Sequence, residues 1–91
     1  MAKTAEIYGT REEWIEANPL RRWRAENGAP QTEIALLVGV TEDTVRHWEH
    51  GRRYPSPESM AALTRVTGEE HLPTAWSAWW AHKKEFKVQW L

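Results

Sequence analysis

The sequence predicts a mainly α-helical domain, with five core helices, an extra helix before them and a short β-strand near each end. Three observations predict this fold. Apolar residues recur at helical spacing through the middle of the 91-residue chain, and residues that start or stop helices divide it at regular intervals. Strict alternation of apolar and polar residues occurs only near the two ends. The length suits a single domain with a modest core.

The first 18 residues are expected to form an N-terminal extension. Residues 3–8 alternate between polar and apolar side chains, which is a strand pattern, and Gly9 ends it. Thr10 and Glu13 have the spacing of a capping box, so a short helix is expected from there through Ala17.

Helix-start and helix-stop residues then delimit the core helices. Asn18 is a good cap and Pro19 suits a first helical position, while Asn27 and Gly28 close that helix. A later helix opens at Ser56–Pro57 and closes at Gly68, and the last one opens at Leu72–Pro73.

Residues 31–53 predict two short helices joined by a tight turn. Gly39 lies at the turn, where the chain leaves the first helix in a left-handed conformation that glycine adopts cheaply. Thr41 can cap the second helix. The apolar residues of the two inner faces are Ile34, Ala35, Val38, Val45 and Trp48. This joint pattern is that of a helix-turn-helix, whose second helix enters the major groove of DNA.

The same region resembles the phage-repressor and Cro-type helix-turn-helix family, often called the XRE family, over roughly residues 19–82. The residues that carry the resemblance are Gln31, Ala35, Val38–Gly39–Val40, Val45, Trp48–Glu49, Gly51 and the basic loop Arg52–Arg53–Tyr54–Pro55. It implies a five-helix, repressor-like DNA-binding domain at 19–82. Residues 83–91 lie outside the resemblance and are expected to form a C-terminal strand that serves as an association or packing element. The implied function is sequence-specific transcription regulation, as a dimeric repressor on a palindromic operator of a phage, mobile element or toxin–antitoxin system.

The resemblance also implies roles for individual residues. It places base readout on the outward side of the second motif helix, at Glu42, Asp43, Thr44 and His47. Arg46 also faces outward by the helical spacing, so it is expected to read bases with them. Phosphate contacts are expected at Gln31, Thr41, Arg52 and Arg53. Arg24 and Glu49 occupy positions that the family pairs in a structural ion pair.

Two of the expected readers have a simpler interpretation. In this interpretation, Glu42 and Asp43 stabilise the helix by placing negative charge at its positive N-terminal end, and they do not contact DNA. Acidic side chains near phosphates also oppose binding, and the formal net charge of the chain is −1. A protein ligand in place of DNA therefore stays open as an alternative.

The seven tryptophans are too many for one small domain to bury without help. Trp23 and Trp48 are expected in the core, with Trp14 covering it from the N-terminal helix. A dimer or packing role is expected for Trp76, Trp79, Trp80, Phe86, Val88 and Trp90. Residues 85–91 alternate like a strand, which would pair with the N-terminal segment or with its copy in a second chain. Stacking on unpaired bases is the alternative for the tryptophans.

Several classes of function find no support. The chain has no cysteine, and its four histidines lack a metal-ligand spacing. No nucleophile context or phosphate-binding loop is present. We expect no enzyme activity, no cofactor, no metal and no small-molecule ligand. No apolar run spans a membrane and no signal peptide is recognised, so we expect the cytoplasm of a bacterial or phage-infected cell. The other functions considered are a phage packaging or replication-initiation subunit and a protein-interaction module.

Overall fold

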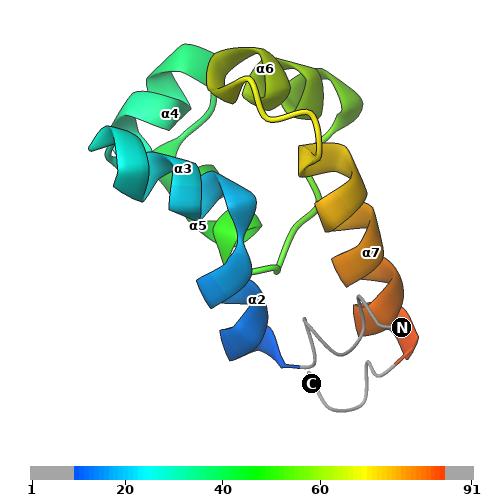
Figure 1. Cartoon of the computed structure of the whole chain (residues 1–91). Helices are drawn as coiled ribbons and strands as arrows, with labels where there is room; N and C mark the ends of the chain where they lie inside the picture. Colours follow the sequence, from blue (N-terminus) through cyan, green and yellow to red (C-terminus); the bar gives the residue numbers. More distant parts are fainter. Residues whose placement is uncertain (1–9, 86–91) are drawn as a thin grey trace.

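The computed structural model describes residues 10–85, with side chains through residue 81. Every regular secondary-structure element in this part of the chain is a helix, and short loops join the helices (Figure 1). The helices are α2 (Arg11–Ala17), α3 (Pro19–Asn27), α4 (Gln31–Val38), α5 (Glu42–Glu49), α6 (Pro57–Thr67) and α7 (Leu72–Glu85). The mainly α-helical fold expected from the sequence is confirmed.

The helix boundaries follow local capping chemistry. At the start of α2, the Thr10 hydroxyl accepts from the Glu13 amide while the Glu13 carboxylate accepts from the Thr10 amide, which completes a capping box. The Thr41 hydroxyl accepts from the Thr44 amide at the start of α5. Gly39 ends α4 at φ +87°, a left-handed conformation, and directs the chain into α5.

The two expected terminal strands are not supported. Residues 3–8 and 86–91, including Phe86, Val88 and Trp90, lie outside the described residues. Glu85 was expected to begin a strand but is the last residue of α7, so this prediction is wrong. Lysine and glutamate are strong helix formers, and residues 83–85 consist of them, so the helix continues as far as Glu85, the residue at which the alternation begins.

The motif helices pack as their sequence requires. Ile34 and Val45 are fully buried between α4 and α5, and Ala35 is almost so. The small side chain of Ala35 lets the helices approach closely. α6 packs on α4 at one end of the molecule, and α2 and α7 extend toward the other end (Figure 1).

A cluster of three tryptophans joins α2 to α7. The side chains of Trp14, Trp76 and Trp79 are all fully buried. Trp14 stacks on Trp79 with 5.5 Å between ring centroids and 7° between planes, and it meets Trp76 edge-on at 5.4 Å. A dimer role and a packing role were both considered for Trp76 and Trp79. Both side chains pack inside the chain in this structure. Trp80 is half-buried and meets the Tyr54 ring edge-on at 5.6 Å.

Candidate DNA interface

The outward side of α5 carries all five expected base readers. Val45, Trp48 and Glu49 are buried, which fixes the rotation of the helix. Glu42 and Asp43 are exposed, and the other three readers are half-buried. The structure therefore brings the five residues together on one accessible surface next to the glycine turn.

Four of these side chains are linked to one another; we call Glu42, Asp43, Arg46 and His47 the outer network. The Nη1 atom of Arg46 donates to Oδ1 of Asp43 at 2.6 Å, and Nε2 of His47 lies 3.3 Å from Oδ2 of the same carboxylate. The Nη2 atom of Arg46 lies 3.5 Å from Oε2 of Glu42. Asp43 is therefore the centre of the surface, with one basic side chain on each oxygen.

The opposite side of α5 holds a second, buried network around Glu49; we call Arg24, Gln31 and Glu49 the inner network. Arg24 binds the carboxylate in a bidentate manner, with Nε to Oε2 at 2.7 Å and Nη2 to Oε1 at 2.8 Å. The side chain of Glu49 is 1% exposed. The hydrogen bond to Glu49 raises the pKa of Arg24, so the guanidinium stays charged. The ion pair expected from the family resemblance is thus present in the structure.

Gln31 takes part in this inner network. Its amide nitrogen donates to Oε1 of Glu49 at 3.1 Å. The sequence suggested a phosphate contact for Gln31, whereas this bond ties the start of α4 to the end of α5. One N–H of the amide stays available for a second acceptor such as a phosphate oxygen.

Asn18 is a member of the site that sequence reasoning recognised only in part. Its expected role as cap is met, because Oδ1 accepts from the Arg21 amide at 3.0 Å. It is also fully buried, and its Nδ2 donates to the backbone oxygen of Glu49 at 3.5 Å. The cap was visible as an Asn-Pro pair, but the second contact joins residues 31 apart and has no local signal.

The C-terminal end of α5 is fixed by the tryptophan cluster. Gly51 has φ +74°, and Nε1 of Trp79 donates to its backbone oxygen at 3.4 Å. A Cβ atom at this position would lie 2.5 Å from Nε1 of Trp79 and 2.9 Å from Cδ1 of Trp14. The turn that follows α5 therefore requires glycine at this position, and it holds the end of the helix against both α2 and α7.

The basic loop after α5 is held at its far end. Arg52 and Arg53 are exposed, while the Tyr54 hydroxyl lies 2.7 Å from Oγ of Ser77 on α7. The Arg52 amide donates to the His47 oxygen at 2.9 Å. These contacts keep both arginines next to the end of α5.

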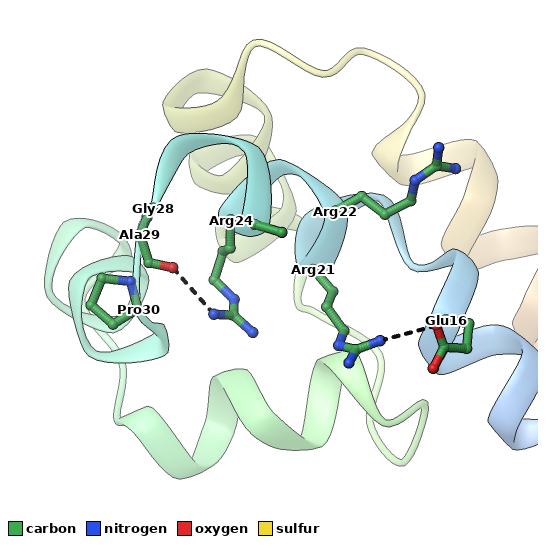
Figure 2. A pocket seen from close by; sticks show the side chains of 8 residues that line it. Glu16, Arg21, Arg22, Arg24, Gly28, Ala29 and Pro30 are labelled. Carbon is green, nitrogen blue, oxygen red and sulfur yellow. Dashed lines mark hydrogen bonds and ion pairs between the residues drawn. The ribbon is translucent and has the colours of Figure 1, made fainter.

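An open pocket of about 760 Å³ lies between α3 and the start of α4 (Figure 2). Its charged lining residues are Glu16, Arg21, Arg22 and Arg24. Arg21 donates to the backbone oxygen of Ile15 at 3.2 Å and pairs with Glu16 at 3.7 Å. Figure 2 shows Arg22 extending away from the other two arginines. The pocket adds positive charge beside the inner network, and no pattern in the sequence indicated that these residues surround one space.

Other kinds of site were sought as well. No group of three His, Cys, Asp or Glu side chains that could hold a metal ion occurs in the part of the chain that the structure describes. Among the described residues, no helix has the length and apolar character needed to cross a membrane.

Comparison with known proteins gives the family. The model of the family described as "Helix-turn-helix domain" matches residues 17–74, which is more than half of the chain. The chain belongs to the helix-turn-helix domain family. The resemblance drawn from the sequence is thereby confirmed at the level of the helix-turn-helix family, and the match spans α3 to α6 completely.

A curated relative agrees with this assignment. It is an uncharacterised HTH-type transcriptional regulator of Methanothermobacter thermautotrophicus, 40% identical over 53 residues, which make up 58% of this chain and 77% of the relative. No solved structure matches the chain. Most of α2, including Trp14, lies outside the family match, although its tryptophan is part of the same core.

Proposed function

We propose that this protein is a sequence-specific, double-stranded DNA-binding transcriptional regulator. The observation that carries the proposal is the outward side of α5, which is accessible and rich in donors and acceptors, on a helix held rigidly from behind. The inner network and Gly51 fix the position and rotation of α5 before any ligand arrives. Such preorganisation reduces the entropic cost of binding. The name of the relative from Methanothermobacter thermautotrophicus supports the regulatory role.

Within this proposal, the residues divide into readers and anchors. Thr44, Arg46 and His47 read base edges in the major groove. Arg52 and Arg53 contact phosphates, and Thr41 and Gln31 contribute phosphate contacts from the starts of α5 and α4. Phosphate contacts set affinity and register, and base contacts set the preferred sequence.

The proposal is tested by selection of bound duplexes from a random DNA pool, followed by titration of the selected duplex across a range of salt concentrations. A DNA-binding regulator enriches a defined sequence, and its affinity falls as salt rises. The rival is a protein-interaction module, which the acidic pair Glu42 and Asp43 favours. If no sequence is enriched and the affinity does not depend on salt, the protein is better described as a protein-interaction module than as a DNA-binding regulator.

The division into readers and anchors has its own test. Replacing Thr44 or His47 with alanine should change the preference at single base pairs, by about 1–3 kcal/mol for a good contact. Replacing Arg52 with alanine should weaken all sequences alike and flatten the salt slope by about one unit. An unchanged selected sequence in both T44A and H47A would show that the reading surface lies elsewhere.

We further propose that the protein represses transcription by binding a palindromic operator as a homodimer, which blocks access to a promoter. The net charge of −1 supports this, because weak general attraction to DNA is offset when two half-sites are bound together. A two-fold dimer would place two α5 helices about 34 Å apart, one turn of DNA. Trp76 and Trp79 are buried within the chain, so the proposed dimer does not depend on them.

The dimer proposal is checked by light scattering of the free protein and by gel shifts on the selected duplex. We expect a dimer on DNA and a symmetric selected sequence. Removing residues 86–91 should weaken operator binding more than it lowers the melting temperature. A full-length chain that stays monomeric at high concentration and on DNA would end this part of the proposal.

A further inference from the structure

We propose that Asp43 does not itself read a base but is a positioning residue, which holds Arg46 ready to recognise a guanine. The inference rests on the proposed DNA-binding function and assigns one base of the target. It replaces the sequence-based expectation that Asp43, like Arg46, reads a base.

The first argument for this role comes from the contacts of Asp43. Its Oδ1 accepts from Nη1 of Arg46 at 2.6 Å, and its Oδ2 lies 3.3 Å from Nε2 of His47. Both carboxylate oxygens therefore already have a basic partner on the same helix. A cytosine amino group could reach Asp43 only at the lone pairs that Arg46 and His47 leave, beside two basic side chains that already lie against the carboxylate. Pairing also offsets the negative charge that would otherwise face the phosphates.

The second argument comes from the direction in which the Arg46 side chain points. Helical side chains lean toward the N-terminus of their helix, and Arg46 contacts two residues of the first turn, Asp43 at 2.6 Å and Glu42 at 3.5 Å. The guanidinium therefore lies over the first turn of α5. This is the end that a recognition helix presents to the major groove.

Guanine is the base that such an arginine suits. A guanidinium has five N–H donors in a fixed plane and binds O6 and N7 of guanine with two of them. The short bond to Asp43 uses Nη1 and leaves other donors for the base. Because the side chain is 40% exposed, it would sample many rotamers without the carboxylate, and ordering them on binding would cost affinity.

The test is selection from a random DNA pool with three variants beside the unaltered protein: D43A, R46A and E33A. Glu33 is an exposed carboxylate in the first turn of α4, so E33A removes the same charge away from Arg46. D43A and R46A should both reduce the preference for one guanine, at the same base pair, by about tenfold. E33A should keep that preference. Thermal melting of each variant establishes that the fold is intact.

Two results would overturn the inference. Loss of preference at a different base pair in D43A than in R46A would make Asp43 a reader in its own right. An unchanged selected sequence in D43A would mean that Arg46 needs no positioning. Either result would leave the proposed function in place, whereas failure of the unaltered protein to select any sequence would remove the proposed function itself.

Discussion

The two sides of α5 carry the same chemical unit, a carboxylate bound to an arginine, in opposite environments. On the inner side, Glu49 is 1% exposed and Arg24 is 18% exposed. On the outer side, Asp43 is 68% exposed and Arg46 is 40% exposed. Both arginines form bonds of 2.7 Å or shorter to their carboxylates. The inner pair is bidentate, whereas Arg46 divides its contacts between Asp43 and Glu42, and the inner pair is also much less exposed to water. These differences suit the two pairs to different roles.

The solvent exposure of each ion pair determines how easily its partners can be exchanged. A charge left unpaired in the interior keeps a large desolvation penalty, so the inner pair holds its geometry tightly. An exposed pair exchanges its partner for water, or for a DNA base, at little cost. The inner network thus fixes where α5 lies relative to α3 and α4, and the outer network stays available for a ligand.

The largest expected effect comes from breaking the inner pair. R24A or E49A should each lower the free energy of unfolding by about 3–5 kcal/mol, because the remaining charge is buried without its partner. The double variant should lose less than the sum of the two. Denaturant melts measure this, with R21A as control, since the Arg21–Glu16 pair is largely exposed. Simple additivity would show that the inner pair is not a coupled unit.

The next effect concerns the end of α5, which shares the rigidity of the inner side. Gly51→Ala should lower the free energy of unfolding by about 2–4 kcal/mol, because the new Cβ meets Trp79 and the backbone has φ +74°. Gly28→Ala is the matched control. Its φ is +63° but nothing lies within 4 Å of its Cβ, so a loss of about 1 kcal/mol is expected. Equal losses would mean that the tryptophans do not confine Gly51.

A smaller effect should appear with pH. Burial lowers the pKa of His50 below its usual 6.5, and the charge of Arg52 lowers it further. The unfolded chain then binds the proton more readily than the folded one, so stability is full above pH 6.5 and falls as pH decreases below it. Thermal melts between pH 7.5 and about 5.5 should show this loss, and H50Q should reduce it. The same slope in H50Q and in the unaltered protein would assign it to other groups.

The smallest effect is expected on the outer side. D43A and R46A should each change the free energy of unfolding by no more than about 1 kcal/mol, with a coupling of about 0.3–0.5 kcal/mol, since exposed helical pairs contribute little. These two variants should instead change the DNA sequence that the protein selects. Losses comparable to those of R24A and E49A would erase the distinction between the two sides of α5.

What the sequence could predict follows from the range of each interaction. Caps such as Thr10 and Thr41 act within four residues, and their side chains identify helix starts directly. The spacing of apolar residues correctly predicted which side of α5 faces the core, because Val45 and Trp48 are both buried. The inner pair joins residues 25 apart and was found only through the family resemblance.

Contacts without a local signal were missed. The role of Gln31 in the inner network and the bond from Asn18 to the end of α5 depend on how three helices meet. The linkage of Asp43 to Arg46 has the helical spacing that favours ion pairs, and that spacing was the available signal. At the C-terminal end, the alternating pattern competed with the helix propensity of lysine and glutamate, and at Glu85 the propensity prevailed.

The distinction between the two sides of α5 is tested most directly by NMR of the arginine side chains during titration with the selected duplex. The Nε–H signal of Arg24 should keep its position, because its bond to Glu49 at 2.7 Å stays intact, while the guanidinium signals of Arg46 should shift and become slower to exchange. Backbone amides of α5 and the loop at Arg52 should shift with them. Large shifts at Arg24 with none at Arg46 would contradict the assignment of the outer side of α5 as the surface that meets DNA.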